Sequence, residues 1–165
     1  GSPIMWKTGH SLIKAKMKET HAELAGEMSG HFFFAERWFG FDDGIYAAAR
    51  LLEILAAAPD GIQALFDALP SAESTPELKV ELKEGEQHAF IERFVAKAQF
   101  EGARINTIDG IRADWPDGWG LVRASNTTPV LVLRFEAESK ERLAQIQQVF
   151  REQMLALDPG LTLPF

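Results

Sequence analysis

The sequence predicts a mixed α and β fold in two parts, with an α+β domain over residues 71–165. Three observations predict this organisation. Residues 78–135 contain several short apolar runs of strand length, and amphipathic helical patterns accompany them. Residues 1–70 contain helical patterns but a single strand, too few for a sheet of their own. The segment 70–76 is poor in apolar residues and bounded by prolines, which predicts a linker between the parts.

The first part opens with a predicted helix over residues 11–24, because Ile13, Met17 and Leu24 fall on one side of it. Ser11 is expected to cap its start, and Gly26 lies just past its end. The other elements predicted here are a loop over 26–31, a buried strand over 32–34, and helices over 45–58 and 62–69. With so few strands, residues 1–70 look like part of a domain whose opening is missing.

The second part is predicted to form an antiparallel-leaning sheet with helices on one face, in the order β-α-β-β-β-α. Residues 78–82 alternate as in a strand, and residues 130–135 form a continuous apolar strand. The pair Asp109-Gly110 suits a tight primed turn, which predicts a hairpin over residues 105–115. The remaining predicted elements are helices over 90–98 and 143–157, a turn over 116–118 and a strand over 119–123.

Composition limits the classes of function. The chain has 165 residues, of which 46% are hydrophobic and 25% charged, so a disordered protein is excluded. A net charge of −7 argues against nucleic acid or an anionic membrane as a general partner, and any bound anion needs a local basic cluster. The absence of cysteine excludes disulfides, Cys-zinc sites and thiol nucleophiles, and it fits a reducing cytoplasm. No apolar run reaches the roughly 20 residues of a membrane span, and no signal peptide is visible.

The first residues favour a start inside a longer protein. The chain opens with Gly1-Ser2 and has no initial methionine. Gly-Ser is a common remnant of proteolytic cleavage or cloning, so we expect residues of the parent protein to precede it. Natural removal of a methionine is the alternative.

The most informative segment for chemistry is residues 123–128, between two predicted strands. It contains one guanidinium, three hydroxyls and one side-chain amide, contributed by Arg123, Ser125, Asn126, Thr127 and Thr128. Together with the backbone N–H groups this is a set of donors that suits a phosphate. The alternative is an ordinary turn stabilised by Ser, Thr and Asn side chains, with the arginine on the surface.

Two segments in the first part are further candidates. In the glycine-bracketed loop 26–31, Glu27, Ser29 and His31 can face one ligand, and a carboxylate with a hydroxyl suits the hydroxyls of a sugar. Alternatively, Glu27 caps a helix and His31 is a hydrogen-bonded boundary histidine. The segment 7–11 precedes a lysine-bearing helix whose N-terminus could attract a phosphate, whereas ordinary capping by Ser11 is the other interpretation.

Other patterns in the sequence carry less specific signals. His10, Glu27 and His31 raise the idea of a zinc site, but they lack the fixed spacing of known zinc motifs. Trp38 and Phe39 could line a pocket. Asp42 and Asp43 look like charges at a helix end rather than a catalytic pair; these interpretations rest on residue type and position alone.

Taken together, the segments 6–11, 26–31, 36–44 and 123–129 resemble the bacterial phosphomannomutase/phosphoglucomutase family of the α-D-phosphohexomutase superfamily. The likeness runs through nearly the whole chain but covers only the C-terminal part of such a four-domain enzyme. It implies an α/β plus α+β fold. Residues 1–70 would be the latter part of an incomplete α/β third domain with the sugar-binding loop. Residues 71–165 would be a complete fourth domain with the phosphate-binding loop and a TATA-binding-protein-like α+β fold.

The resemblance also implies an activity. Enzymes of the family transfer phosphate reversibly between the C1 and C6 oxygens of glucose or mannose phosphates, through a phosphoserine and a bisphosphorylated sugar. Glu27 and Ser29 would hold sugar hydroxyls, His10 would lie near the sugar, and His31 would transfer or position a proton. The residues that would grip the phosphate are Arg123, Ser125, Asn126, Thr127 and Thr128. The parent enzyme would use Mg²⁺, with glucose 1,6-bisphosphate as activator and intermediate, and would be a cytoplasmic monomer.

Two family motifs are missing. The serine loop Thr-Ala-Ser-His-Asn-Pro and the metal loop Asp-Gly-Asp-Gly-Asp do not occur in this chain, so its residues include neither the nucleophile nor Mg²⁺ ligands. We therefore expect no turnover by this chain alone. The alternatives are a stand-alone phosphosugar-binding module and, less in keeping with the motifs, a His/Glu metallohydrolase. A sheet cut short would leave an uncovered edge and apolar face, so we expect self-association or lower stability of residues 1–70.

Overall fold

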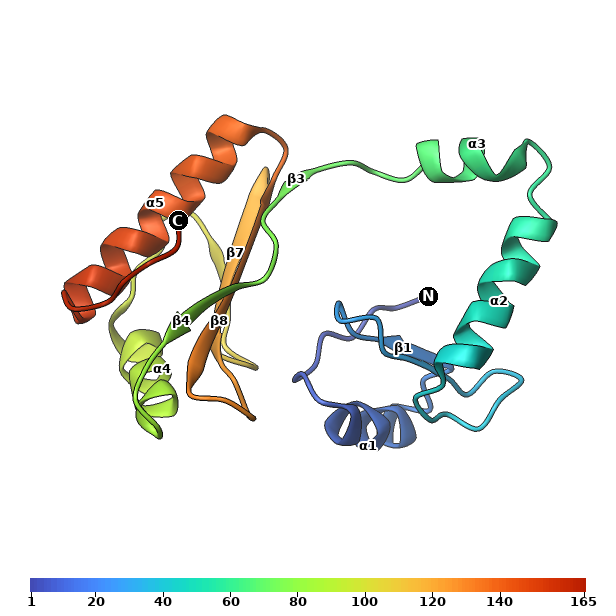
Figure 1. Ribbon diagram of the computed structural model, residues 1–165, viewed down its shortest axis with the longest axis horizontal. Coiled ribbons are helices and arrows are strands. Elements are labelled where there is room, and N and C mark those ends of the chain that lie inside the picture. The colour runs from blue at the N-terminus through green and yellow to red at the C-terminus, as the bar shows by residue number, and fades with distance from the viewer. The chain divides into compact units, whose positions relative to one another are not determined.

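The computed structural model describes residues 1–165 and divides the chain into two compact units, residues 1–70 and 71–165. Both units contain helices and antiparallel strands, so the predicted mixed class is confirmed (Figure 1). Residues 1–70 are unit 1 and residues 71–165 are unit 2.

Unit 1 is built around a short β-hairpin. Its elements are α1 (His10–Thr20), β1 (Leu24–Gly26), β2 (Phe32–Phe34), α2 (Gly44–Ala56) and α3 (Gly61–Asp67). Strands β1 and β2 pair antiparallel, with Ala25 opposite Phe33. The Phe33 side chain is completely buried and packs with Ile13 and Met17 of α1 in a small apolar core. The predicted strand over 32–34 is therefore confirmed.

Helix α1 differs from its prediction at both ends. It begins after Gly9 without a side-chain cap, so Ser11 lies within the first turn and the predicted cap is wrong. It ends at Thr20 rather than at residue 24, because His21 takes a left-handed conformation with φ of 54°. The N–H groups of His21 and Ala22 both donate to the Met17 carbonyl. These bonds close the helix early, so residues 24–26 can pair as β1.

Unit 1 leaves most of its large apolar side chains exposed. All the exposed large apolar side chains of the chain lie in this unit except Ile105. Helices α2 and α3 bury no residue at all, and Ile45 and Leu52 of α2 are 87% and 65% exposed. This exposure agrees with the expectation that residues 1–70 have an apolar face without a partner.

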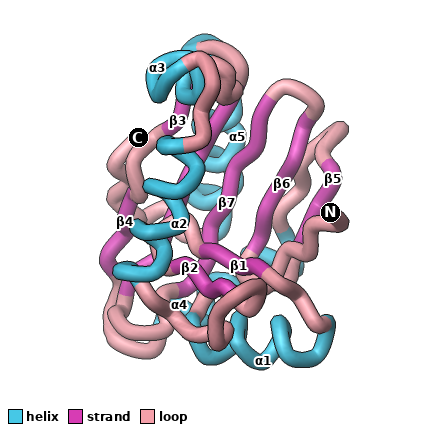
Figure 2. The backbone as a smooth tube through the Cα atoms, turned by 90° about the vertical axis from the view of Figure 1, so that its right-hand side faces the viewer, coloured by secondary structure: helices cyan, strands magenta, loops and turns pink.

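Unit 2 is a six-stranded antiparallel sheet with two helices. The sheet order is β3-β8-β7-β6-β5, and β4 also pairs with β8, further along that strand (Figure 2). Its elements are β3 (Glu73–Ser74), β4 (Leu78–Glu81), α4 (Glu86–Lys97), β5 (Arg104–Asn106), β6 (Ile111–Trp115), β7 (Gly118–Ala124), β8 (Val130–Ala137) and α5 (Lys140–Leu157). Helices α4 and α5 lie on the same face of the sheet, as predicted (Figure 1).

The core of unit 2 lies between this face and the helices. Phe135 of β8 and Phe150 of α5 are fully buried, with their ring centroids 5.2 Å apart in an edge-to-face arrangement. Gly120 of β7 allows this close packing, because a Cβ atom there would come within 2.5 Å of the Phe150 ring. The predicted helical face over 143–157 is confirmed, since Ile146, Phe150 and Met154 are all buried.

Three details of unit 2 differ from the predictions. The segment expected to be a linker contains β3. Thr75 beside it is 9% exposed; its N–H donates to the Phe135 carbonyl, and its Oγ1 accepts a hydrogen bond from Phe135 N. The predicted order β-α-β-β-β-α names three strands between the helices, but all four strand segments indicated there by the sequence form strands, as β5 to β8. The hairpin of β5 and β6 has a four-residue loop instead of a tight two-residue turn, because Asn106 Oδ1 accepts a hydrogen bond from Ile108 N and holds the loop open.

Candidate functional site

The tip of the β1–β2 hairpin carries the residues predicted to bind a sugar. Glu27 N donates to His31 O at 2.9 Å, and Gly30 N donates to Glu27 O at 3.0 Å, so residues 27–31 form a closed turn. Gly30 has φ of 92°, in the region that favours glycine. Glu27, Ser29 and His31 are thereby brought together on one short turn.

The Glu27 carboxylate joins this turn to the segment that precedes α1. Glu27 Oε1 accepts a hydrogen bond of 2.8 Å from Gly9 N, and Oε2 accepts one of 3.2 Å from Ser29 Oγ. The negative charge therefore lies at the N-terminus of α1, where the helix dipole favours it. The structure thus brings together two of the three predicted segments, and Glu27 accepts the N–H of Gly9, the residue before the helix.

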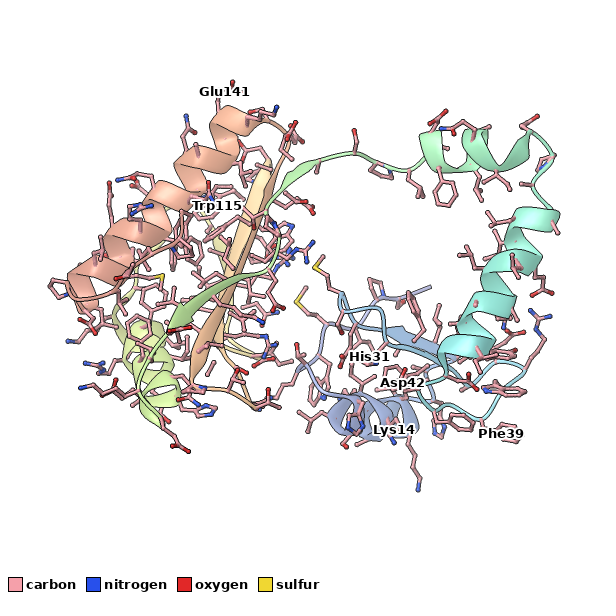
Figure 3. All side chains as sticks on the ribbon, viewed as in Figure 1. Lys14, His31, Phe39, Asp42, Trp115 and Glu141 are labelled. Carbon is pink, nitrogen blue, oxygen red and sulfur yellow. The ribbon has the colours of Figure 1, made fainter.

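His31 is paired with an aspartate that sequence reasoning did not connect to it. His31 Nδ1 lies 2.6 Å from Asp42 Oδ2 (Figure 3). Asp43 Oδ1 instead accepts a hydrogen bond from Tyr46 N and caps α2. The prediction of a helix-end charge is therefore confirmed for Asp43, the N-cap, while Asp42, the residue before it, also pairs with His31. His10 makes a separate contact, with the Ser11 hydroxyl at 3.3 Å.

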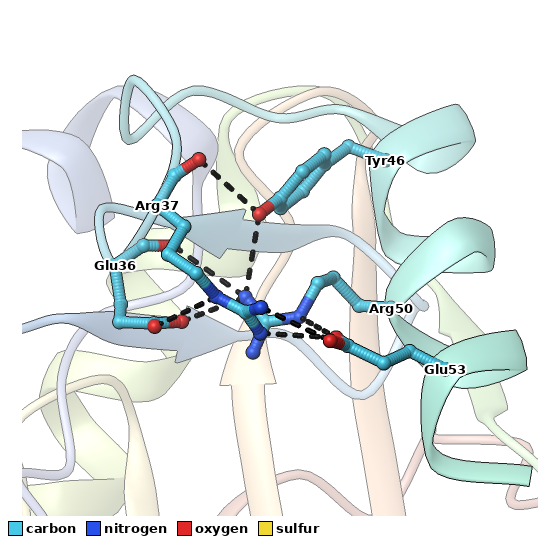
Figure 4. A network of polar contacts seen from close by, with 5 residues as sticks. All are labelled: Glu36, Arg37, Tyr46, Arg50 and Glu53. Carbon is cyan, nitrogen blue, oxygen red and sulfur yellow. Dashed lines mark hydrogen bonds and ion pairs between the residues drawn. The ribbon is translucent and has the colours of Figure 1, made fainter. Parts of the chain in front are cut away.

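A network of ion pairs holds the loop after β2 against α2 (Figure 4). Arg37 donates two hydrogen bonds to Glu53, at 3.0 and 2.9 Å, and Arg50 donates to Glu36 at 2.7 Å. Tyr46 Oη donates to the Arg37 carbonyl at 3.3 Å. Arg37 takes φ of 59°, so the loop backbone turns sharply there. The hydrogen bonds from Arg37 lower the pKa of the Glu53 carboxyl, and the charge of Arg50 lowers it further.

An open cavity of about 530 Å³ lies in unit 1 between α1 and the residues that follow β2. Its lining includes Lys14, Lys18, His21 and Phe39. The prediction that Phe39 lines a pocket is confirmed. Trp38 does not line it and stacks on Tyr46, with ring centroids 4.2 Å apart.

In unit 2 the loop between β7 and β8 holds the predicted phosphate-binding residues. Ser125 is 7% exposed, and its Oγ accepts hydrogen bonds from Thr127 N at 3.3 Å and Thr128 N at 3.2 Å. The Thr128 hydroxyl lies 3.0 Å from the same oxygen. The loop is thus a serine-centred turn that already uses two of the expected backbone donors. Asn126 is exposed and makes no hydrogen bond, so its donors point to no protein partner.

Arg123 lies beside this loop on the face of the sheet opposite the helices. Its only hydrogen bond is to the neighbouring Ala124 carbonyl, at 3.2 Å, and it makes no ion pair. Arg134 lies on the same face and makes neither kind of contact. The register pairs Arg123 with Val132 and Arg134 with Leu121, which makes the two arginines diagonal neighbours. Two adjacent guanidinium groups without a carboxylate partner favour an anion, and only strand pairing reveals Arg134.

The structure contains no group of three or more His, Asp or Glu side chains that could hold a metal ion. In particular, Glu27 and His31 of the zinc hypothesis have protein partners instead. None of the helices has the length and apolar character that crossing a membrane requires.

Comparison with known proteins gives consistent matches. Residues 1–72 match the family described as "Phosphoglucomutase/phosphomannomutase, alpha/beta/alpha domain III", and residues 77–153 match "Phosphoglucomutase/phosphomannomutase, C-terminal domain". A phosphomannomutase/phosphoglucomutase of Pseudomonas aeruginosa is 61% identical over 165 residues, covering 100% of this chain and 36% of the relative. A phosphoglucomutase of Neisseria gonorrhoeae is 57% identical over 166 residues, covering 99% and 36%. The crystal structure of a phosphoglucomutase/phosphomannomutase family protein from Burkholderia thailandensis superposes with a TM-score of 0.90 at 57% identity, covering 100% of this chain and 35% of that one.

Proposed function

The chain belongs to the phosphoglucomutase/phosphomannomutase family, and we propose that it is the portion of a phosphohexomutase that recognises the hexose phosphate. It spans about a third of the length of the curated relatives it matches, with 36% of the Pseudomonas aeruginosa protein covered.

The observation that carries the proposal is the environment of Arg123. This guanidinium has no ion pair and lies next to a loop rich in hydroxyl groups, in a chain whose net charge is −7. A phosphate accepts paired hydrogen bonds from a guanidinium and further ones from N–H and O–H groups. Arg123 would bind the phosphate that does not react, with Ser125, Asn126, Thr127 and Thr128 as the other donors.

The hairpin tip of unit 1 would bind the sugar. Glu27 keeps acceptor capacity on both oxygens beyond the bonds to Gly9 and Ser29, because each carboxylate oxygen accepts two hydrogen bonds. Ser29 is exposed, and its hydroxyl, whose hydrogen is donated to Glu27, can accept a hydrogen bond from a sugar hydroxyl. Glu27 and Ser29 would hold ring hydroxyls, His31 would transfer or position a proton, and His10 would lie near the sugar.

The reaction proposed for the longer protein interconverts hexose 1-phosphate and hexose 6-phosphate of glucose or mannose. It proceeds through a phosphoserine and a bisphosphorylated sugar, glucose 1,6-bisphosphate in the case of glucose. When bound, Mg²⁺ would neutralise charge on the transferring phosphate. The carboxylates of this chain do not form a set that fits Mg²⁺. Lacking the serine loop as well, the chain is expected to be inactive alone.

The proposal is tested by NMR titration of the 165-residue chain with glucose 1-phosphate, with glucose as the control ligand. We expect shifts of the amides at 123–128 with the phosphate, little response to glucose, and loss of the shifts in Arg123→Ala. The matched control is Arg93→Ala, which removes an exposed guanidinium from α4 and should leave the shifts unchanged. No change at residues 123–128 at millimolar glucose 1-phosphate would contradict the proposal.

A further inference from the structure

We propose that Asp42 is a positioning residue for His31, and that its carboxylate fixes the ring in the tautomer with hydrogen on Nδ1. This inference deepens the proposed function, on which it rests for the meaning of His31. The observation behind it is the 2.6 Å separation of His31 Nδ1 and Asp42 Oδ2, two residues that lie 11 positions apart in the chain.

The tautomer follows from the chemistry of the pair. An ionised carboxylate has acceptors but no hydrogen to donate, so the nitrogen that bonds to it must carry the hydrogen. His31 Nδ1 therefore donates to Asp42 Oδ2. In the neutral ring Nε2 is then left with a free lone pair, directed to the other side of the imidazole. A free imidazole prefers the opposite tautomer, so the carboxylate changes the state of the ring.

Asp42 is itself held in place by rigid elements on both sides. Its backbone forms a β-bridge with Phe33, the fully buried centre of the unit 1 core. The next residue, Asp43, caps α2 through Tyr46 N at 2.9 Å and also accepts a hydrogen bond from Trp38 Nε1 at 3.2 Å. Asp42 is thus fixed between the hairpin and the start of α2, and Figure 3 shows its side chain next to that of His31.

The arrangement prepares His31 to accept a proton. A sugar hydroxyl hydrogen-bonded to Nε2 can pass its proton to that nitrogen while its oxygen keeps the electron pair of the O–H bond. The ring then carries a positive charge, which the Asp42 carboxylate balances at 2.6 Å. In the other tautomer Nε2 would carry a hydrogen and could only donate. Asp42 therefore acts through His31 and needs no contact with the sugar.

The experiment is ¹⁵N NMR of the histidine rings of the 165-residue chain at about pH 9, where histidines are neutral. Long-range proton–nitrogen spectra distinguish the two tautomers by the nitrogen shifts. We expect His31 to be mainly the Nδ1–H tautomer in the wild type and to change to mainly Nε2–H in Asp42→Ala. The control is Asp60→Ala, which removes an exposed carboxylate of unit 1 that makes no side-chain hydrogen bond and should leave the His31 tautomer unchanged. His88 of α4 serves as an internal reference in every spectrum.

Two results would overturn the inference. One is a predominant Nε2–H tautomer of His31 in the wild type, which requires no variant to fold. The other is the same tautomer ratio in the wild type and Asp42→Ala. The titration with glucose 1-phosphate separates this failure from failure of the proposed function. Unchanged amide shifts at residues 123–128 would contradict the proposed function, whereas the tautomer measurement tests the Asp42–His31 pair and needs no ligand.

Discussion

The carboxylate of Glu27 accepts a hydrogen bond from the backbone N–H of Gly9 at 2.8 Å, across 18 positions of the chain. This bond ties the turn of the β1–β2 hairpin to the residue before α1. The turn that would face a sugar is therefore also a structural part of unit 1. Substitutions at Glu27 are expected to affect both stability and binding.

Replacing Glu27 with alanine removes the acceptor for Gly9 N and the negative charge at the start of α1. We expect the free energy of unfolding of unit 1 to fall by about 1–2 kcal/mol. Amide exchange of α1 measures this directly. Glu19→Ala, which breaks only an exposed ion pair with Lys16, should cost less than about 1 kcal/mol. Equal losses in the two variants would mean that the Gly9 bond contributes little.

Ser125 organises the phosphate loop by accepting hydrogen bonds from the amides of Thr127 and Thr128. In Ser125→Ala these amides lose their acceptor, so we expect their exchange to accelerate and unit 2 to lose about 1–2 kcal/mol. Ser139→Ala provides the comparison, because it removes a similar acceptor at the N-cap of α5. Ser139→Ala should destabilise unit 2, but the amides of residues 127 and 128 should exchange more slowly in it than in Ser125→Ala. Unchanged exchange in Ser125→Ala would rule out the serine-centred turn.

Sequence reasoning predicted the elements of both units well where hydrophobic periodicity was long, as in the helix over 143–157. It failed where a single local contact decided the outcome. The left-handed conformation of His21 shortens α1, and nothing in the sequence pattern distinguishes it from one more helical residue. Asp42 and Asp43 are identical and adjacent, yet one caps a helix and the other pairs with His31. That choice depends on the bridge between Asp42 and Phe33, a tertiary contact.

Strand pairing explains the other omissions. Sequence reasoning did not single out Arg134, because it described residues 130–135 as a continuous apolar strand. The position of Arg134 beside Arg123 follows only from the register of β7 and β8. The strand β3 lies in a segment whose composition is that of a linker, and it pairs because β8 extends past β4 to residue 137.

The apolar face of α2 predicts the behaviour of the chain in solution. Ile45 and Leu52 are seven residues apart, hence on one side of the helix, and are 87% and 65% exposed. We expect the mass measured by light scattering to rise above that of one chain as the concentration increases. The double variant Ile45→Glu, Leu52→Glu should remain monomeric, whereas Ile105→Glu in unit 2 should associate like the wild type. A wild-type mass equal to that of one chain at all concentrations would contradict this prediction.

The contact between Gly120 and Phe150 sets the spacing of α5 and the sheet in unit 2. A methyl group at residue 120 would lie 2.5 Å from the Phe150 ring and 2.9 Å from the Phe135 ring. Both rings are fully buried and cannot move aside freely, so Gly120→Ala should destabilise unit 2 by about 1–3 kcal/mol. Gly44→Ala is the matched substitution, since its methyl group meets open space at the start of α2. Thermal unfolding followed by near-ultraviolet circular dichroism would compare them, and equal midpoints would show that the core accommodates the methyl.

The network around Arg37 makes the stability of unit 1 depend on pH. Hydrogen bonds from Arg37 hold the pKa of the Glu53 carboxyl below its ordinary value of 4.5 in the folded chain. A group with a lowered folded pKa contributes stability above its unfolded pKa, and this contribution is lost as the pH falls through the folded value. Glu53→Gln should therefore be less stable than the wild type at about pH 6, and the difference should shrink toward about pH 3. Hydrogen exchange of the α2 amides in both proteins at both pH values measures this difference in stability. Glu23→Gln, whose carboxylate makes no ion pair, should differ in stability from the wild type by the same amount at both pH values. A stability difference for Glu53→Gln that does not change between the two pH values would exclude the ion-pair network as the cause of that difference.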